Sequence, residues 1–518
     1  MFPLTKTKRT ELILLGLCLL TGFALRFYAF DKKSLWLDEI YTFEDSRDDL
    51  QGQIKFYQEN PTFLHPPLFF ILTHLFHPFP KPERDLRIIP LVFGTLSIPM
   101  IFFLVRQFSP SIALLCTFSL TFMVYHISFS QDGRAYSFLL FFGMTSLFFL
   151  MRYLKTSNRV YLLLTATVYS ILFLTSYSSI LFIVFSQILW FYQPKEMSPR
   201  KRIFSFFILS GNTLLMILPW VLFIALNYKG KPLMDPIHMD APGSLWKVLY
   251  GLLSDWAAYP PLLITSFILL TLFPFCSKEK RNALVLLTLF LLPIAGLYLF
   301  CKLLDIPHFI ASRYFINFLP LFLILLYLSL NAFEIKFQRV RKWFRPSLLF
   351  LILFIASNVL ALPFYYRSEK MDFKSLAAYL KEHLQEGDKI FVVTTALMPG
   401  ILHYFGTPPK WRHHKAEPIM ESDKKVGYQI PFYYRNQYHT LLYSDACCNQ
   451  WVADGSRLWI AVFKWKAKEI KGKSPALLKG YFDGSFLNHD HFPADASIYL
   501  FLWDPKSPDE KELDLSIE

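Results

Sequence analysis

Two short motifs, Trp36-Leu37-Asp38-Glu39 and His65-Pro66-Pro67-Leu68, set the organisation of this chain. Both lie within residues 31–87, a stretch that begins directly after the first long apolar segment. The adjacent carboxylates therefore stand where the chain emerges from a membrane, and the His-Pro-Pro sequence opens another apolar run. Acidic side chains beside lipid are costly and usually mark a functional site. We expect this first loop to hold the chemistry of the protein.

Composition places the chain among membrane proteins. Of its 518 residues, 54% are apolar and 18% aromatic, and the mean hydropathy is +0.34. The apolar residues form long uncharged runs, which are typical of transmembrane helices. In a soluble protein the net charge of +14 would suggest nucleic acid. Here much of the excess lies in short loops between the runs, so it predicts topology and no nucleic-acid partner.

Eleven segments are predicted to cross the membrane, and the first is interpreted as a retained helix because no small-residue cleavage site follows it. Within a few residues, they are 12–30, 88–105, 111–129, 137–151, 161–176, 178–193, 203–225, 259–276, 282–301, 313–333 and 347–365. With the N-terminus in the cytoplasm, the dense basic clusters between spans all fall on the inner side, as the positive-inside rule requires. We therefore predict a multi-pass protein of the cytoplasmic (inner) membrane.

One apolar run is excluded from the spans. Leu68 to Phe79 is about twelve residues long, too short to cross a ~30 Å hydrocarbon layer at ~1.5 Å per residue. Counting it as a crossing would also place every later basic cluster outside. We predict instead a helix over Pro66 to Phe76 that lies in the outer interface. Asp38, Glu39 and His65 then share the outer side of the membrane.

A second domain follows the last span. We predict a transmembrane domain over residues 1–365, which includes the large first outer loop 31–87, and an extracytoplasmic α/β domain over 366–518. The expected elements of this domain are a helix over 373–384 that Asp372 caps, strands over 389–395, 458–463 and 498–503, and a helix over 475–481. Its role is left open between guiding an acceptor and covering the site.

Four motifs in this order resemble a known family: WLDE at 36–39, HPPLFFILTHLF at 65–76, Arg87-Ile88-Ile89-Pro90, and Gln131-Asp132-Gly133-Arg134-Ala135-Tyr136. They are similar to the membrane glycosyltransferases of the protein-mannosyltransferase and aminoarabinose-transferase type, and the resemblance covers residues 8–365. It implies the GT-C fold, a polytopic α-helical membrane protein of about eleven transmembrane helices. It also implies an enzyme that moves a sugar from a polyprenyl-phosphate carrier to an acceptor on the outer face.

The paired acids are the predicted catalytic residues. Inverting transfer needs one base to deprotonate the acceptor hydroxyl, and a single carboxylate suffices because phosphate is already a good leaving group. The resemblance gives Asp38 the role of base or metal contact. Glu39 is then expected to orient the site or to bind a divalent ion, the one cofactor considered. Alternatively, both acids cap a short helix that begins near Asp38.

The other candidates are expected to bind the sugar or the lipid phosphate. His65 can bind a cation, contact the sugar or cap the helix that follows it. Arginines at the outer ends of spans can hold phosphate with a bidentate fork, or can simply anchor the helix. The candidate binding residues are His65, Arg87, Arg134, Tyr136, Tyr177, His308, Arg313 and Tyr314, and the candidate metal ligands are Asp38, Glu39 and His65.

The functional hypothesis is an inverting glycosyltransferase of the cell envelope that depends on a polyprenyl-phosphate-linked sugar. The acceptor is left open among protein, lipid and glycan. The alternative is a transporter or flippase for a lipid-linked sugar. Almost every charged residue stands at the end of a span, whereas transporters usually place ionisable groups near the midplane of the membrane. This distribution favours the enzyme.

Overall fold

The structure is a computed structural model, and it divides the chain into two compact units. It describes residues 6–59, 65–192, 197–228, 244–257, 259–304, 310–337, 345–406, 433–435, 441–444, 456–464, 466–467, 477–486, 495–504 and 506. The first unit holds Met1–Asp31 and Asp48–Pro363, and the second holds Lys32–Arg47 with Phe364–Asn488 and Phe492–Glu518. Residues 32–47, expected in the loop of the membrane domain, therefore group with the C-terminal domain.

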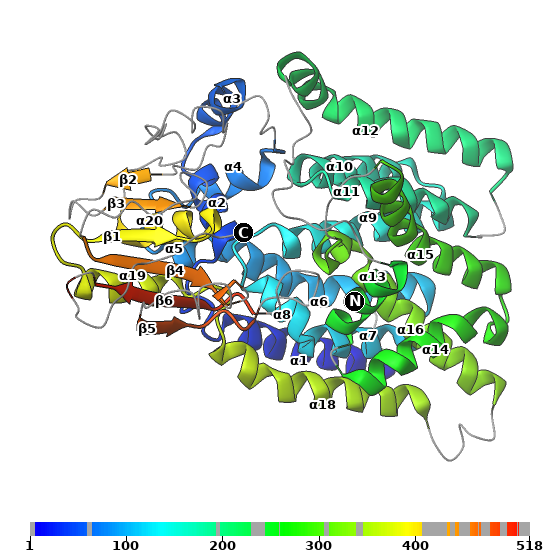
Figure 1. Cartoon of the computed structure of the whole chain (residues 1–518). Helices are drawn as coiled ribbons and strands as arrows, with labels where there is room; N and C mark the ends of the chain where they lie inside the picture. The colour runs from blue at the N-terminus through cyan, green and yellow to red at the C-terminus, as the bar shows by residue number, and fades with distance from the viewer. Residues whose placement is uncertain are drawn as a thin grey trace. The chain divides into compact units, whose positions relative to one another are not determined.

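The first unit is helical (Figure 1). Its helices are α1 (Lys6–Phe27), α3 (Leu50–Glu59), α4 (Leu68–His74), α5 (Pro82–Asp85), α6 (Ile88–Phe108), η1 (Pro110–Ile112), α7 (Ala113–Phe122), α8 (Val124–Ser130), α9 (Tyr136–Thr156), α10 (Arg159–Thr175), α11 (Ser179–Ser186), η2 (Gln187–Phe191), α12 (Pro199–Asn227), α13 (Leu245–Trp256), α14 (Pro260–Cys276), α15 (Lys280–Leu303), η3 (Ser312–Phe318), α16 (Leu319–Lys336) and α18 (Pro346–Arg367).

The helices confirm a multi-pass membrane protein. Among the described residues, seven helices are long and apolar enough to cross a membrane, or up to nine if each of two bent pairs is one span. Each predicted span overlaps one of these helices or one of two shorter apolar helices, Arg159–Thr175 and Ser179–Phe191. Helix α4, within the segment predicted to lie in the interface, is only seven residues long.

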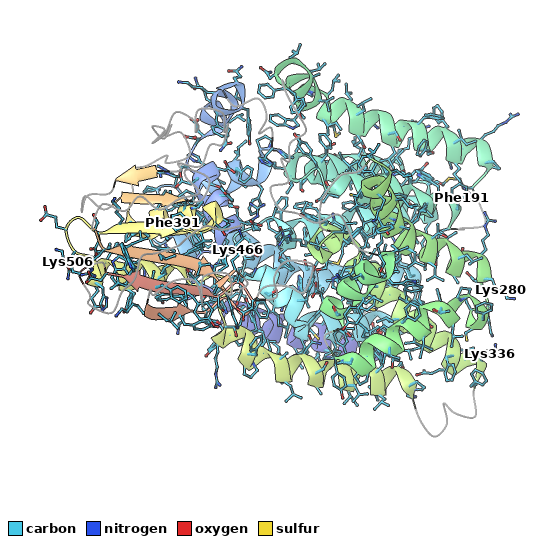
Figure 2. All side chains as sticks on the ribbon, viewed as in Figure 1. Phe191, Lys280, Lys336, Phe391, Lys466 and Lys506 are labelled. Carbon is cyan, nitrogen blue, oxygen red and sulfur yellow. The ribbon has the colours of Figure 1, made fainter. Side chains whose placement is uncertain are left out.

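The core of this unit forms around α16. Side chains from Leu319 to Tyr327 are buried on every face of the helix, which is the pattern expected for the centre of a bundle. Helices α6 and α9 pack closely, and ring contacts such as Phe93 with Phe138, at 4.7 Å between centroids, lie between them. Figure 2 shows Lys280 and Lys336, both from predicted inner loops, at the same end of the bundle.

The third predicted span is bent by 60° between α7 and α8, at Met123. The break leaves the last carbonyls of α7 without partners from their own helix. Arg26 of α1 supplies them, because its guanidinium donates to the carbonyls of Leu120 (2.9 Å) and Thr121 (3.1 Å). The same guanidinium lies 2.6 Å from Nδ1 of His126. A buried arginine therefore stabilises the bend.

The second unit is an α/β domain built on a six-stranded sheet of order β2-β3-β1-β4-β6-β5. The strands are β2 (Tyr433–Arg435), β3 (Leu441–Ser444), β1 (Lys389–Val392), β4 (Leu458–Phe463), β6 (Ile498–Trp503) and β5 (Leu477–Phe482). Helices α2 (Leu37–Ser46), α19 (Phe373–His383) and α20 (Met398–Phe405), with η4 (Thr395–Leu397), complete it. As predicted, Asp372 caps α19, and its carboxylate accepts the N–H of Ser375 at 3.0 Å.

The helix predicted over 475–481 is wrong. Residues 477–482 form β5, which pairs antiparallel with β6 and is an edge strand of the sheet. Leucine and lysine in this segment favour a helix intrinsically, but pairing with the buried β6 overrides that preference. A register shift between Leu478 and Gly480 adapts the strand to its partner.

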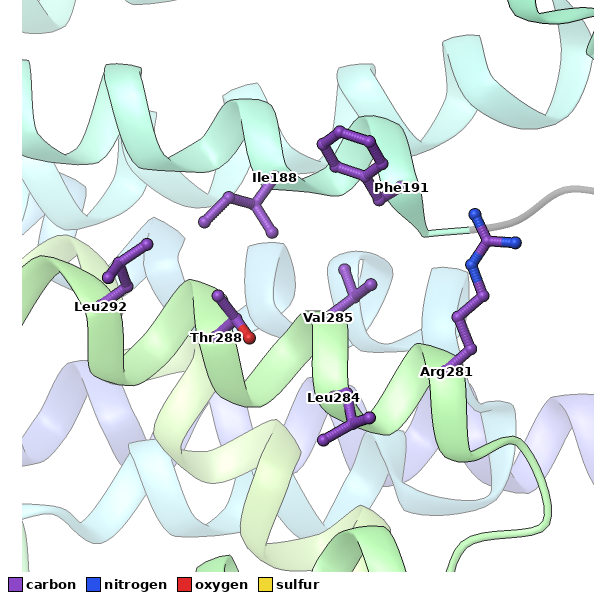
Figure 3. A pocket seen from close by; sticks show the side chains of 7 residues that line it. All are labelled: Ile188, Phe191, Arg281, Leu284, Val285, Thr288 and Leu292. Carbon is purple, nitrogen blue, oxygen red and sulfur yellow. The ribbon is translucent and has the colours of Figure 1, made fainter.

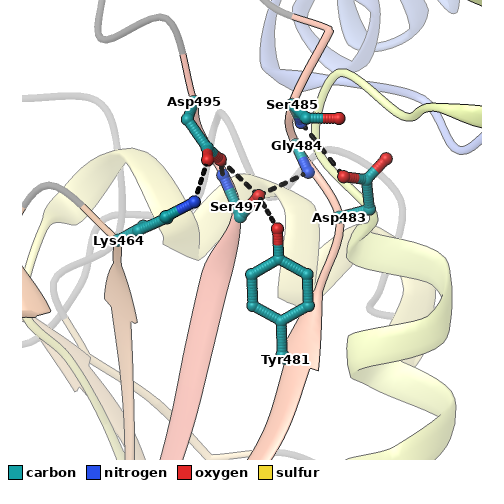
Figure 4. Close-up of polar contacts among 7 residues, drawn as sticks. All are labelled: Lys464, Tyr481, Asp483, Gly484, Ser485, Asp495 and Ser497. Atoms are coloured by element: carbon teal, nitrogen blue, oxygen red, sulfur yellow. Dashed lines mark hydrogen bonds and ion pairs between the residues drawn. The ribbon is translucent and has the colours of Figure 1, made fainter. Parts of the chain in front are cut away.

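A polar network joins the ends of β4, β5 and β6 (Figure 4). The buried Ser497 hydroxyl accepts the N–H of Gly484 at 3.0 Å and lies 2.8 Å from the hydroxyl of Tyr481. Asp495 pairs with Lys464, which also lies over the Tyr481 ring. Burial raises the pKa of Asp495, but hydrogen bonds from Lys464 and Ser497 outweigh it and leave the pKa below its ordinary value.

Candidate functional site

Several predicted site residues of the first unit gather where α1 ends and α6 and α9 begin. The side chain of Gln131 donates to the carbonyls of Arg26 (2.7 Å) and Tyr28 (2.8 Å), so the end of α8 is tied to the end of α1. Arg87, just before α6, donates to the carbonyl of Phe30 at 3.0 Å. We call this region the polar end. It carries the Gln-Asp-Gly-Arg motif predicted from the sequence.

His65 and Arg134 lie within electrostatic reach of each other at the polar end. Desolvation, together with the positive charge of Arg134, lowers the pKa of His65 to about 4. The His65 side chain is nevertheless exposed by its accessible surface. At neutral pH His65 is then an uncharged donor and acceptor, and Arg134 supplies the positive charge.

A ladder of aromatic rings connects Tyr136 with the segment that carries Arg313. Tyr136 packs on Phe129 at 4.7 Å between centroids, and Phe129 packs on Tyr125 at 4.8 Å. The Tyr125 hydroxyl lies 3.0 Å from Oγ of Ser312, the residue before Arg313. Arg313 and Tyr314 therefore belong to the same end of the bundle as Arg134 and Tyr136.

Arg87 and Tyr177 have structural partners. Arg87 is 2% exposed, so its guanidinium supports the junction of α1 and α6, and contact with a ligand would require local opening. The half-buried Tyr177 accepts a hydrogen bond from Nε1 of Trp220 at 3.0 Å. Its hydroxyl proton can still be donated to another group. His308, the remaining candidate, lies outside the described residues.

Asp38 and Glu39 belong to the second unit, on the first turn of α2. Glu39 is 1% exposed, and its carboxylate accepts the N–H of Trp36 at 3.3 Å, which caps the helix. Asp38 is more accessible. Acids in the first turn also interact favourably with the helix dipole. The capping alternative thus describes Glu39, while the catalytic role of Asp38 stays a prediction.

Contacts within the second unit fix α2. The hydroxyl of Tyr404 accepts the N–H of Leu35 at 2.7 Å, and the ring of Phe43 packs edge-on against His403 at 4.8 Å. Nζ of Lys370 lies 4.8 Å from the centroid of the Trp36 ring. The WLDE motif is therefore held by α20 and by the segment before α19.

Of the predicted metal ligands, Asp38 and Glu39 lie in the second unit and His65 in the first. In the part of the chain that is described, no group of three or more His, Cys, Asp and Glu side chains is placed to hold an ion. The Glu39 carboxylate is engaged with the backbone of its own helix. The metal-binding role of Asp38, Glu39 and His65 stays a prediction, and we derive no step through a metal.

Sequence reasoning missed Asp255. The segment before the eighth predicted span was treated as a loop, but it contains α13. Asp255 on this helix accepts a hydrogen bond from Oγ of Ser312 at 2.6 Å. The available signal was the helical spacing of Val248, Leu252 and Trp256, which form the buried face of α13.

A groove of about 540 Å³ lies between η2 and α15 (Figure 3). Its lining residues are Ile188, Phe191, Arg281, Leu284, Val285, Thr288 and Leu292. None of the predicted site residues is among them, and its walls are apolar apart from Arg281 and Thr288. The groove suits hydrocarbon better than a sugar, so it is not the candidate site.

The comparisons agree with the motifs. The family model of dolichyl-phosphate-mannose-protein mannosyltransferase matches residues 64–223, which include His65, Arg87 and Arg134. No curated protein matches the chain by sequence. The fold and these motifs define a multi-pass membrane protein that resembles the GT-C glycosyltransferases, as predicted.

In structure the chain is similar to ArnT from Cupriavidus metallidurans in the apo state. The TM-score is 0.55 at 10% sequence identity, over 96% of this chain and 98% of ArnT. The same ArnT bound to undecaprenyl phosphate gives a TM-score of 0.51 at 11% identity, over 98% of this chain and 100% of the other. At these identities the likeness establishes a shared fold.

Proposed function

We propose that this protein is an inverting glycosyltransferase that moves a sugar from a polyprenyl-phosphate carrier to a protein, lipid or glycan acceptor on the outer face of the membrane. The observation that carries the proposal is the polar end, where Arg134 and Tyr136 are linked through Phe129 and Tyr125 to the segment of Arg313. Two guanidinium groups at one end of a lipid-embedded bundle suit the phosphate of a lipid. The fold shared with ArnT, whose structure is known with undecaprenyl phosphate bound, supports this assignment.

In the proposed reaction the acceptor oxygen attacks the anomeric carbon from the side opposite the phosphate. The new carbon–oxygen bond forms as the bond from the anomeric carbon to the phosphate oxygen breaks. The electron pair of that bond goes to the phosphate, whose charge Arg134 and Arg313 stabilise. The acceptor proton goes to Asp38. The configuration at the anomeric carbon is inverted because attack and departure occur on opposite faces.

His65 has a different part in this proposal. Since its pKa is about 4, its ring is uncharged at neutral pH and adds no positive charge for the phosphate. A neutral imidazole donates one hydrogen bond and accepts another, which suits a sugar hydroxyl. We therefore assign His65 to the sugar rather than to the phosphate.

The test is Asp38→Asn in the full-length protein, supplied with polyprenyl-phosphate-linked sugars and cell-envelope acceptors. Loss of a general base is expected to lower kcat by about 10²- to 10⁴-fold. Asp49→Asn is the matched control, because Asp49 caps α3, the next helix in the sequence, by accepting the N–H of Gly52, a role that Asn can fill. Full transfer by folded Asp38→Asn protein would remove Asp38 from the mechanism. Transport of a lipid-linked sugar without any transfer would favour the flippase.

A further inference from the structure

Asp255 is the final acceptor in a directed chain of hydrogen bonds. Its Oδ2 lies 2.6 Å from Oγ of Ser312, and the same Oγ lies 3.0 Å from the hydroxyl of Tyr125. A carboxylate only accepts, so Ser312 uses its single proton on Asp255. Tyr125 must then donate to Ser312. The chain runs from Tyr125 through Ser312 to Asp255, and it fixes the hydroxyl of Ser312 from two sides.

The helix that carries Asp255 has the character of a helix lying in the membrane interface. One face of α13 is buried through Val248, Leu252 and Trp256. Its other face exposes Trp246 (66%) and Tyr250 (64%). Trp and Tyr concentrate at the depth of lipid headgroups, where an apolar ring and a polar group are both satisfied. Asp255, at the last turn of this helix, is therefore expected at the level where a lipid phosphate sits.

Ser312 is the first residue of η3 and directly precedes Arg313. The rest of η3 is anchored in the core, since Phe315, Ile316 and Phe318 are almost fully buried. The start of η3 is held by the hydroxyl of Ser312. The backbone at Arg313 is thus fixed on one side by the core and on the other by Asp255. The guanidinium of Arg313 lies 5.7 Å from the centroid of the Tyr314 ring.

We propose that Asp255 is a positioning residue for binding of the carrier phosphate. Through its hydrogen bond with Ser312 it fixes the position of Arg313. The negative charge of Asp255 would repel a phosphate in direct contact, so the carboxylate is assigned to positioning and not to phosphate binding. This inference rests on the proposed function, because it takes the carrier phosphate as the ligand of Arg313.

The test measures binding of undecaprenyl phosphate to purified full-length protein, without turnover. Asp255→Asn and Ser312→Ala are each expected to weaken binding about tenfold, a change of about 1.4 kcal/mol. Because both substitutions break the same contact, the double variant should bind undecaprenyl phosphate as tightly as the weaker-binding of the two single variants. In an Arg313→Gln background, Asp255→Asn should have no further effect. Asp255→Glu should restore part of the affinity.

Ser254→Ala is the matched control, since Ser254 on the same helix donates to the carbonyl of Gly251 at 2.8 Å, within its own helix. It should bind the carrier as the native protein does. Additive losses in the double variant, or a persistent effect of Asp255→Asn in the Arg313→Gln background, would overturn the positioning role. Native protein that fails to bind undecaprenyl phosphate would instead overturn the proposed function itself. If Asp255→Asn lowers thermal stability, carrier binding is measured instead for Ser312→Ala, for Tyr125→Phe and for the double variant of these two. Additive losses would again overturn the positioning role.

Discussion

At the scale of single residues, the polar end combines a charged group, Arg134, with a neutral hydrogen-bonding group, His65. Arg134 carries a fixed positive charge, and desolvation next to it keeps His65 neutral with a pKa of about 4. A histidine in this motif, read from the sequence alone, is equally compatible with a cation-binding, sugar-binding or capping role. The low pKa shows that the ring is uncharged at neutral pH. A neutral imidazole can bind a cation, contact a sugar or cap a helix, so the role of His65 stays a prediction.

The low pKa of His65 predicts how stability depends on pH. Between pH about 6.5, the ordinary value, and about 4, the unfolded chain binds a proton that the folded chain does not. The free energy of unfolding therefore falls as pH falls through this window. His65→Asn should make that loss smaller, as measured by thermal unfolding of the detergent-solubilised protein at a series of pH values. His383→Asn, at an exposed histidine of α19, is the control. Equal slopes for native and His65→Asn protein would contradict the prediction.

Arg134 is predicted to bind phosphate with two parallel N–H donors. Lysine keeps the charge but loses this geometry, so Arg134→Lys should raise the KM for the lipid-linked donor by about tenfold with a smaller change in kcat. Arg152→Lys is the control, because Arg152 lies in a predicted inner loop where it contacts Tyr161. An unchanged donor KM for Arg134→Lys would argue that the arginine only anchors α9.

At the scale of helices and strands, the sequence was sufficient wherever local signals agree with tertiary context. Strands β4 and β6 have the predicted bounds, and α19 begins after its predicted cap at Asp372. The β5 segment was misread because its pairing with β6 is set by residues about twenty positions away. The bend at Met123 has no proline or glycine to announce it. It depends on Arg26, which is distant in the sequence.

The candidate site, too, could be predicted from the sequence only in part. Charged residues at the ends of spans could be grouped because topology brings alternate span ends to one side of a membrane. Asp255 could not be found in this way, since α13 precedes its span and its contact with Ser312 joins residues far apart in the chain. Nor could the sequence assign Asp38 to the unit that contains the C-terminal sheet.

The bend between α7 and α8 should depend on Arg26. Arg26→Met removes the donors to the carbonyls of Leu120 and Thr121 inside an apolar bundle, and it also deprives His126 of its partner. Breaking a buried charged contact of this kind is expected to cost about 3 kcal/mol. Denaturation in detergent measures the change. Arg9→Met, at an exposed arginine of the same helix, should leave stability nearly unchanged. Similar midpoints for the two variants would show that the bend does not need Arg26.

At the scale of the whole molecule, the proposed function requires one orientation in the membrane. A donor carried on a polyprenyl phosphate is used on the outer side only if the predicted inner loops, with Lys280 and Lys336 at one end of the bundle, face the cytoplasm. The N-terminus then lies in the cytoplasm and the C-terminal domain outside. The distribution of basic residues favours this orientation, because lysine and arginine in short loops are retained on the inner side.

Cysteine labelling tests the orientation directly. In a background without native cysteines, Lys506→Cys in the second unit should react with a membrane-impermeant maleimide on intact cells, because position 506 is exposed. Lys280→Cys, at the exposed start of α15, should react only after the membrane is opened. Labelling after opening also serves as the control that both thiols are reactive. The reverse pattern would put the C-terminal domain and the acids of α2, which belong to the same unit, in the cytoplasm, where a donor used on the outer face could not reach them.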